Sequence, residues 1–276
     1  MILVADSGSS KTHWQFISKD ETVAYETIGL NPYFVNSAKV AEVFNPSIDL
    51  SKVEKVFFYG AGCSNEPSCA IIKKGLIQKI PNAKIEVTHD LLAAARATCG
   101  NVEGIACILG TGSNSCFFDG EKIKKNVPSL AYIIGDEGSG GDMGKELLRR
   151  YFYKELSEDL MHQFKLMFDL DVVKVLDRTY NQPFPNRFLA SFTQFLADNI
   201  DTADVQEIVE DSFSKFFNRH ISKYKHYKSL HINFVGSIAK VFEQQLVRVA
   251  DKYSTQIGEI IQSPINNLVA YHKKDL

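Results

Sequence analysis

A short apolar run that ends in a turn of small residues occurs twice in this chain, once at the start and once near the middle. Residues 2–5 are followed by the turn at 6–12, and residues 104–109 by the turn at 110–115. In each half the pattern predicts paired strands first, and then helices alternating with strands. No repeat of residues accompanies this order. The duplicated order of elements therefore predicts two α/β domains of similar topology.

The expected elements define the domain boundaries. In the first half we expect strands at 2–5, 14–18, 22–27, 55–59 and 84–88, a turn at 18–21, and helices at 37–44, 66–80 and 91–98. In the second half we expect strands at 104–109 and 231–235, a hairpin of 115–118 with 121–124, a strand or loop at 256–261, mainly helices from 141 to 227, and a terminal helix from Pro264. The N-terminal domain would comprise 1–100 plus 264–276, and the C-terminal domain 101–263 with a helical insertion.

Composition narrows the function classes. The chain has 276 residues, 45% of them hydrophobic, and a net charge of −2. This balance does not favour nucleic acid or an anionic membrane as a partner, and no apolar run approaches the roughly 20 residues of a membrane span. The five cysteines include no Cys-x-x-Cys pair. Reduced thiols and a cytoplasmic protein are therefore expected.

The first turn combines one carboxylate with small residues. Asp6 ends the first apolar run, and Gly8, Ser10, Lys11 and Thr12 follow it. Backbone N–H groups in such a turn can hold a phosphate, while the carboxylate holds its hydrated divalent cation. The segment is not a P-loop, because positions 5 and 10 are not glycine. An ordinary turn explains the same residues equally well.

The second turn offers several groups for an anion. Gly110 and Gly112 flank Thr111, so that the backbone can approach a ligand closely, and Ser113 and Asn114 add side-chain donors. Its place matches that of the Asp6 turn in the first half. We therefore expect the two turns to hold the two ends of one triphosphate.

The segment 135–144 is the richest in glycine. Five glycines in ten residues disfavour any regular element, so the segment is expected to be irregular for a functional reason. Asp136 and Glu137 could accept hydrogen bonds from substrate hydroxyls. A helix that begins near Gly140 would attract anions at its N-terminus. The alternative is a flexible surface loop.

Two further sites lie where a strand leads into a helix. Asp90 follows the strand at 84–88, and it is either the N-cap of the next helix or a general base at the ligand-binding edge of the sheet. Gly236 and Ser237 follow the strand at 231–235. They form either a tight turn only or a place where a flat base lies against the backbone.

The ordered set of motifs resembles a known family. In chain order the motifs are Asp6-x-Gly-x-x-Lys-Thr, Thr88-His89-Asp90, Gly110-Thr111-Gly112-Ser113-Asn114, Gly135-Asp136-Glu137-Gly138-Ser139 and Val235-Gly236-Ser237. Their order and spacing are similar to those of the N-acetylglucosamine kinase-like ATPases of the actin, sugar kinase and Hsp70-type ATPase superfamily. The resemblance covers nearly the whole chain. It implies two ribonuclease H-like (actin-like ATPase) domains, with a nucleotide and sugar cleft between them.

The resemblance also implies roles for single residues. Ser10 and Thr111 would line the ATP phosphates, Asp6 would hold the hydrated magnesium ion, and Gly236 would lie by the adenosine. The implied nucleotide-binding set comprises Asp6, Gly8, Ser10, Lys11, Thr12, Gly110, Thr111, Gly112, Gly236 and Ser237. The implied sugar contacts are Asn31, Asp90, Ser113, Asn114, Ser129, Asp136 and Glu137, with Asp90 as the base toward the 6-hydroxyl. The chain departs from the family pattern at 7–9 and 129–132.

The implied activity is phosphorylation of an amino sugar with ATP and Mg²⁺, at the 6-hydroxyl of N-acetylglucosamine in the first instance. Glucosamine, N-acetylmannosamine and N-acetylmuramic acid stay open as acceptors, and a homodimer is one open oligomeric state. Two alternatives belong to other classes. One is an ATPase that activates an acyl-CoA reductase or dehydratase, and the other is a sugar sensor without catalysis.

Overall fold

The chain folds into two compact units. The computed structural model describes residues 1–8, 10–19 and 21–275, so Ser9 of the first turn and Asp20 of the turn expected at 18–21 lie outside the described residues. Unit 1 comprises Met1–Val102, Gly120–Ile123 and Ser263–Leu276, and unit 2 comprises Glu103–Asp119 and Lys124–Gln262.

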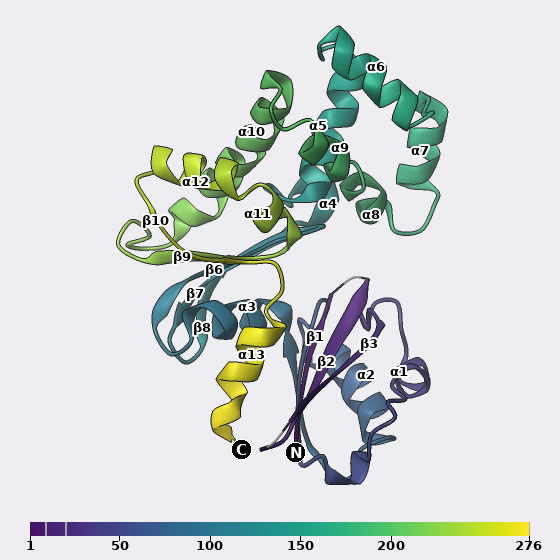
Figure 1. Ribbon diagram of the computed structural model, residues 1–276, viewed down its shortest axis with the longest axis vertical. Helices are drawn as coiled ribbons and strands as arrows, with labels where there is room; N and C mark the ends of the chain where they lie inside the picture. Colours follow the sequence, from purple (N-terminus) through teal and green to yellow (C-terminus); the bar gives the residue numbers. More distant parts are fainter. Residues whose placement is uncertain (9, 20, 276) are drawn as a thin grey trace. The chain divides into compact units, whose positions relative to one another are not determined.

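Unit 1 is built on a mixed five-stranded sheet. Its strand order is β3 (Thr22–Ile28), β2 (Lys11–Ile17), β1 (Ile2–Ser7), β4 (Lys55–Gly60) and β5 (Lys84–His89) (Figure 1). The strand β2 is antiparallel to both of its neighbours, β1 and β3, whereas β1, β4 and β5 are parallel to one another. In this register Asp6 pairs with Tyr59, and Tyr59 pairs with Thr88. The carboxyl ends of three strands therefore meet at one edge of the sheet.

An aromatic core fixes two helices to one face of this sheet. The helices are α1 (Ser37–Val43) and α2 (Glu66–Ile77), and the side chains of Asn36 and Asn65 cap their N-termini. Trp14, Phe44 and Phe58 are fully buried between sheet and helices. The ring centroids of Trp14 lie 4.5 Å from Phe44 and 5.6 Å from Phe58.

Two other helices of unit 1 pack against each other, namely α3 (Asp90–Cys99) and the C-terminal α13 (Ile265–His272). Side chains alternate across a strand, so Phe57 and Tyr59 of β4 point away from the Trp14 core. His272 of α13 stacks on Phe57 with a centroid distance of 3.8 Å and forms a 2.8 Å hydrogen bond with the Tyr59 hydroxyl. These contacts fasten the end of the chain to its first sheet.

Unit 2 repeats the mixed sheet. Its strand order is β10 (Gln256–Ile261), β9 (His231–Val235), β6 (Glu103–Leu109), β7 (Ser113–Asp119) and β8 (Ile123–Val127). The strands β6 and β7 are antiparallel, and β6, β9 and β10 are parallel. Ile108 pairs with Val235, so the turns that follow β6 and β9 lie at the same edge.

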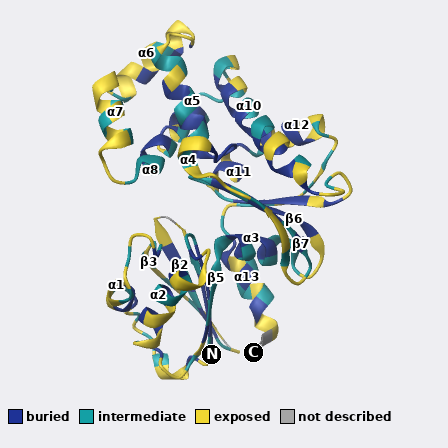
Figure 2. Ribbon diagram, turned by 180° about the vertical axis from the view of Figure 1, so that it is seen from behind, coloured by how far each residue is buried: buried dark blue, intermediate teal, exposed yellow. Residues whose placement is uncertain are grey.

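Helices make up most of unit 2. They are α4 (Ala131–Ile134), α5 (Gly140–Phe152), α6 (Glu158–Met167), α7 (Val172–Tyr180), α8 (Pro185–Ala190), α9 (Thr193–Asp198), α10 (Ala203–Arg219), α11 (Ser237–Val241) and α12 (Glu243–Lys252). A core rich in phenylalanine joins them to the sheet, and Phe164, Phe213, Phe216 and Phe217 are fully buried in it. Figure 2 shows the buried inner faces and the mostly exposed α7. In the part of the chain that the structure describes, no helix is long and apolar enough to cross a membrane.

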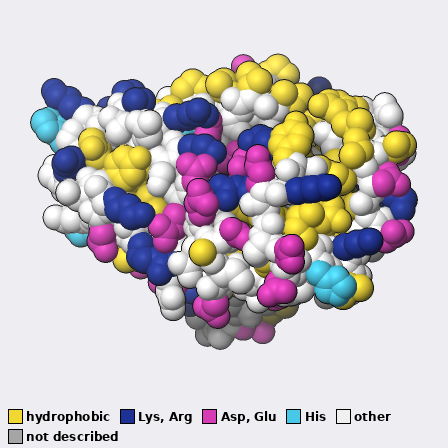
Figure 3. Space-filling model, turned by 90° about the horizontal axis from the view of Figure 1, so that it is seen from above, with side chains coloured by type: hydrophobic (Ala, Val, Ile, Leu, Met, Phe, Trp, Pro, Cys, Tyr) yellow, Lys and Arg dark blue, Asp and Glu magenta, His cyan; other side chains and the backbone are white. Residues whose placement is uncertain are grey.

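Charged side chains pair across neighbouring helices of unit 2. Arg150 of α5 contacts Glu207 of α10 at 2.9 Å, and Lys252 of α12 contacts Glu210 at 2.8 Å. Acidic and basic side chains also lie next to one another on the molecular face drawn in Figure 3. That face therefore carries both positive and negative side chains.

The α/β fold class expected from the sequence is confirmed, with a five-stranded sheet in each unit. Several boundaries were wrong by a few residues. Asp6 still belongs to β1, and Ser113 and Asn114 belong to β7 and not to the turn before it. The hairpin turn is longer than expected, because β8 starts at Ile123. Sheet hydrogen bonds extend these strands past the end of the apolar pattern.

We expect the contacts of His272 to stabilise unit 1 measurably. His272→Ala would remove the ring from Phe57 and the hydrogen bond to Tyr59, and should lower the free energy of unfolding by about 2–3 kcal/mol. Urea denaturation followed by the fluorescence of Trp14, the single tryptophan, would measure this in unit 1. His162→Ala on the exposed surface of α6 is the control. An equal effect of both substitutions would contradict the anchoring role.

Candidate functional site

Two carboxylates lie together at the edge of the unit 1 sheet. Asp6 is near the end of β1, and Asp90 directly follows β5, so the parallel register brings them to the same edge. Partial burial and the charge of Asp90 raise the pKa of Asp6 to about 7. Burial is the larger of the two causes, because it disfavours the charged form, and the nearby like charge acts in the same direction.

Asp90 is not the N-cap of α3. That role belongs to His89, whose Nδ1 accepts a 3.2 Å hydrogen bond from the N–H of Leu92. Burial raises the pKa of Asp90, although the charge of His89 and backbone N–H groups act in the opposite direction. Asp90 is the first residue of α3 and not its N-cap, so the capping alternative is wrong, although backbone N–H groups of Asp90 and Leu91 interact with its carboxylate.

Asn31 lies close to this edge because buried hydroxyl groups hold the chain before it. The N–H of Leu30 donates to Oγ of Ser7 at 3.0 Å, and that hydroxyl lies 2.7 Å from the hydroxyl of Thr12. The backbone of Gly62 packs against Oδ1 of Asn31, which accepts a 3.0 Å hydrogen bond from the N–H of Tyr33. The amide nitrogen of Asn31 is thus the group that it can offer to a ligand.

The remaining residues of the first turn fall into two groups. Gly8 and Ser10 are exposed, and the N–H of Gly8 donates to the carbonyl of Lys11 at 3.0 Å. Lys11 forms a 2.8 Å ion pair with Glu26 of β3. Thr12 is fully buried, and its hydroxyl donates to the carbonyl of Ile28. Thr12 therefore supports the Asn31 segment and has no free side-chain atom for a nucleotide.

In unit 2 the turn at Gly110–Thr111–Gly112 is joined to the glycine-rich segment. The N–H of Gly140 donates to the carbonyl of Gly110 at 2.8 Å, and that of Gly141 to the carbonyl of Thr111 at 3.1 Å. Ser139 is the N-cap of α5, and its hydroxyl oxygen accepts a hydrogen bond from the N–H of Asp142. The expectation that this helix N-terminus attracts an anion was wrong, because its first N–H groups are used to hold the turn.

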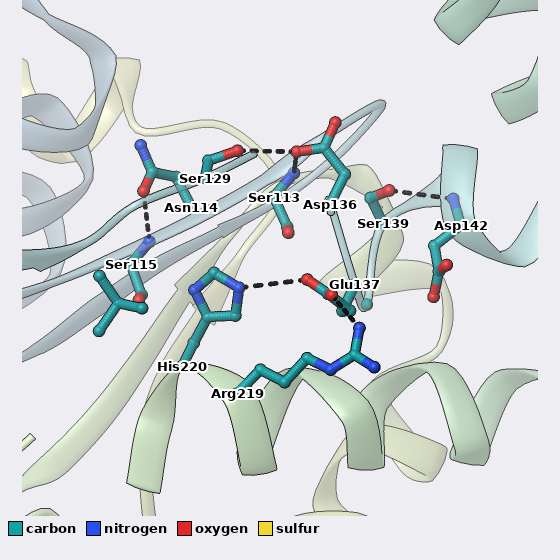
Figure 4. A network of polar contacts seen from close by, with 12 residues as sticks. Ser113, Asn114, Ser115, Ser129, Asp136, Glu137, Ser139, Asp142, Arg219 and His220 are labelled. Atoms are coloured by element: carbon teal, nitrogen blue, oxygen red, sulfur yellow. Dashed lines mark hydrogen bonds and ion pairs between the residues drawn. The ribbon is translucent and has the colours of Figure 1, made fainter. Parts of the chain in front are cut away.

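Asp136 is aimed by its neighbours at the same turn (Figure 4). Its Oδ1 accepts hydrogen bonds from the Ser129 hydroxyl at 2.8 Å and the Ser113 N–H at 3.3 Å. Oδ2 lies against Gly112, where an added Cβ would be only 2.8 Å away, so a glycine is required there. Burial raises the pKa of Asp136, despite these hydrogen bonds.

The amide of Asn114 has a fixed orientation. Its Oδ1 accepts from the N–H of Ser115 and from Nδ2 of Asn126, both at 2.9 Å. Asn126 Nδ2 also donates to the carbonyl of Ser115 at 2.6 Å. Because Oδ1 is occupied by donors, Asn114 can present only its N–H groups to a ligand. Ser113 contributes a buried hydroxyl without a hydrogen-bond partner among the described residues.

Glu137 is arranged differently from Asp136. It is only 6% exposed, Arg219 donates to its Oε1, and His220 Nε2 lies 3.3 Å from Oε2. Burial alone would raise the pKa of Glu137, but the hydrogen bonds from Arg219 and His220 lower it. Both carboxylate oxygens are therefore engaged inside the protein.

Gly236 and Ser237 follow β9 at the edge that also carries the Gly110 turn. The N–H of Gly236 donates to the carbonyl of Ile261 at 2.9 Å, and its Cα faces the carbonyl of Leu109. Ser237 is exposed. These two turns are thus brought together within unit 2, whereas Asp6, Asp90 and Asn31 are brought together within unit 1.

Sequence reasoning missed the residues that support these groups. Asn126, Ser212, Arg219 and His220 were not singled out, because each acts through a partner distant in the sequence. His89 was quoted only as part of a motif and was given no role of its own, although it bonds the nearby Leu92. The single available signal was the run Thr88-His89-Asp90, in which the histidine precedes the helix.

A magnesium site would depend on few protein ligands. Among residues 1–8, 10–19 and 21–275, no three His, Cys, Asp or Glu side chains gather as a metal site. Mg²⁺ commonly binds through one or two carboxylates, with water and substrate phosphates as its other ligands. The pair Asp6 and Asp90, with its raised pKa values, fits such a partial site.

Comparison with solved structures shows strong similarity over the full chain. A protein from Porphyromonas gingivalis, provisionally named N-acetylglucosamine kinase, is 37% identical, covers 100% of this chain and 99% of its own, and has a TM-score of 0.94. A protein of the same provisional name from Chromobacterium violaceum is 13% identical, with a TM-score of 0.74 and 98% coverage of both chains. No family model and no curated protein matches the chain.

A ROK family glucokinase from Streptomyces griseus, solved with glucose and AMPPNP, shares the fold at 12% identity and a TM-score of 0.55, covering 99% of this chain and 98% of its own. At that identity the likeness concerns the fold alone. The full-length similarity to the Porphyromonas gingivalis protein is much stronger. The chain therefore belongs to the N-acetylglucosamine kinase-like family of actin-like ATPases.

Proposed function

We propose that the protein is a kinase that transfers the γ-phosphoryl group of ATP to an amino sugar, most specifically to the 6-hydroxyl of N-acetylglucosamine. The observation that carries this proposal is the Asp6–Asp90 pair in a chain that is 37% identical, end to end, to a provisionally named N-acetylglucosamine kinase. In this proposal Asp6 holds the metal ion through water, and Asp90 accepts the proton of the sugar hydroxyl.

Asp90 has the properties of a general base. Burial raises the pKa of Asp90 above that of an ordinary aspartate, and a higher pKa makes the ionised carboxylate a stronger acceptor for a proton. In the proposed reaction Asp90 takes the proton of the sugar hydroxyl as the oxygen–phosphorus bond forms and the bond from the γ-phosphorus to ADP breaks. Positioning and electrostatics supply most of the catalysis in such transfers.

The other polar groups have complementary hydrogen-bonding roles in this proposal. Asn114 can only donate, and Asn31 offers its amide nitrogen, so both suit oxygen acceptors on the sugar. Both hydrogen bonds to the Asp136 carboxylate go to Oδ1, so Oδ2 can accept one from a sugar hydroxyl or amide N–H. The backbone turns at Gly8–Ser10 and Gly110–Gly112 would contact the phosphates. Mg²⁺, held through Asp6 and water, would neutralise charge on the triphosphate.

The proposal predicts ADP release that depends on an amino sugar. A coupled ADP assay should show turnover with N-acetylglucosamine and magnesium, and mass spectrometry should find one added phosphate on the sugar. Glucosamine, N-acetylmannosamine and N-acetylmuramic acid are the comparison substrates. Hydrolysis of ATP that is unaffected by any sugar would favour an activator ATPase, and tight sugar binding without turnover would favour a sensor.

Asp90→Asn should lower turnover by roughly 10²–10⁴-fold, because the amide cannot accept the proton. Binding of ATP should stay near the wild-type value. Asp49→Asn, on the surface of the same unit, is the matched control and should keep full activity. Since His89 caps α3, a loss of activity in Asp90→Asn cannot be assigned to a lost cap. Unchanged turnover would remove Asp90 from the mechanism.

Asp6 should make stability depend on pH in an identifiable direction. Its pKa is about 7 in the folded state, well above the 3.8 of an ordinary aspartate, so the folded state binds the proton more tightly and ionisation of Asp6 opposes folding as pH rises toward 7. Asp6→Asn should therefore raise Tm in EDTA, with a gain that grows from pH 5 to 7 and then stays constant.

Asp49→Asn is the control here as well, because the Ser51 hydrogen bonds lower the pKa of Asp49 and give the opposite sign. Magnesium with ADP should stabilise the wild type at pH 8 but not Asp6→Asn. An Asp6→Asn gain that is the same at every pH, or an equal magnesium effect on both proteins, would contradict the metal role.

A further inference from the structure

The loop at residues 135–139 receives several of its contacts from one helix, α10. Contacts from α10 reach the loop at Glu137 and Gly138, which follow Asp136, the residue that the proposed function assigns to the sugar. Figure 4 shows Glu137 facing Arg219 and His220, while Asp136 points toward Ser113 and Ser129. Consecutive side chains therefore point to different partners.

The loop backbone is in an unfavourable conformation. Asp136 has a φ of +59°, in the left-handed region that costs free energy for a residue with a Cβ. Gly138 has a φ of +78°, and a Cβ there would lie 2.9 Å from Cβ of Phe216 on α10. Such a conformation persists only where the surroundings hold it. Ser113 and Ser129 hold the Asp136 side chain, and the α10 contacts hold the residues that follow it.

Ser212 is one of the α10 contacts. Its hydroxyl accepts a 3.1 Å hydrogen bond from the N–H of Gly138 and donates a 2.7 Å hydrogen bond to Oδ2 of Asp142. The side chain is 2% exposed, so water does not readily replace it. Ser212 thereby joins the loop to the first turn of α5.

Glu137 supplies the other α10 contacts. Its carboxylate is buried against Arg219 and against His220, which is itself 3% exposed and stacks on Phe216 with a centroid distance of 4.8 Å. The last turn of α10 therefore holds Glu137. Because Glu137 is only 6% exposed and is directed at these two partners, it presents little surface to a ligand.

We propose that Ser212, Glu137 and Arg219 are positioning residues that act on the sugar through Asp136, and that Glu137 is not itself a sugar contact. This inference rests on the proposed function, because it takes Asp136 as the sugar contact. It assigns α10 the task of keeping Asp136 in its left-handed conformation, with Oδ2 beside Gly112. Loosening α10 contacts should weaken sugar binding and leave nucleotide binding unchanged.

The test compares two serines of the same helix. Ser212→Ala leaves the Gly138 N–H and the Asp142 carboxylate without this partner, whereas Ser214 donates only to the carbonyl of Glu210 within α10. Ser212→Ala should raise the Kd and the KM for the sugar roughly tenfold, as expected for a lost buried hydrogen bond. Ser214→Ala should not, and the KM for ATP should stay constant in both.

A second pair of variants tests the Glu137 contact without disturbing the buried serine. Arg219→Met removes one of the two partners of Glu137, and Lys215→Met one turn earlier removes an ion pair with Asp211 on the same helix. Arg219→Met should weaken sugar binding several-fold, and Lys215→Met should leave it unchanged. Hydrogen exchange of the free protein should be faster at 135–139 in Ser212→Ala and Arg219→Met only.

The outcomes separate this inference from the proposed function. If the wild type phosphorylates the sugar but Ser212→Ala and Arg219→Met bind it as their controls do, positioning by α10 is overturned and the kinase proposal stands. If the wild type binds the sugar without turnover, and both variants weaken binding and expose the loop to exchange, the kinase proposal fails and the positioning role is supported. Unchanged exchange in both variants would also overturn the inference.

Discussion

The placement of two carboxylates, Asp6 and Asp90, at one edge of a parallel sheet is the constraint on which unit 1 depends. Burial raises the pKa of both carboxylates, and the charge of Asp90 raises that of Asp6 further, so ionising the pair opposes folding. The aromatic core around Trp14 and the anchoring of α13 through His272 stabilise the unit against this cost. Buried carboxylates of this kind persist only where the surrounding packing offsets their cost.

In unit 2, hydrogen bonds stabilise an acidic residue in an unfavourable backbone conformation. Asp136 is kept in a left-handed conformation, and its orientation comes from Ser113 and Ser129 on one side and from α10 on the other. The amides at the start of α5 hold the Gly110 turn and are not open to a ligand. The glycine-rich segment is therefore a rigid junction, and its irregular backbone reflects close approach between elements.

The candidate groups were predicted from sequence to different degrees. Asp6, Asp90 and the Gly110 turn were found because polar residues directly after apolar strands are visible as a local pattern. Thr12 was misjudged, since the pattern does not show that its hydroxyl is buried under Leu30. The sequence left open whether Asp90 caps α3 or acts as a base. It did not point to His89 as the cap, because histidine is an unusual N-cap.

The sequence by itself determined the two α/β units, the order of their elements and the places where strands end in polar turns, because these depend on local periodicity and on residues close in the chain. Only the tertiary structure decided which groups are free to act. Glu137 and Asp136 are adjacent and both acidic, yet one is occupied by Arg219 and His220 and the other keeps an oxygen free. Those partners lie more than 80 positions away along the chain, so no local pattern records them.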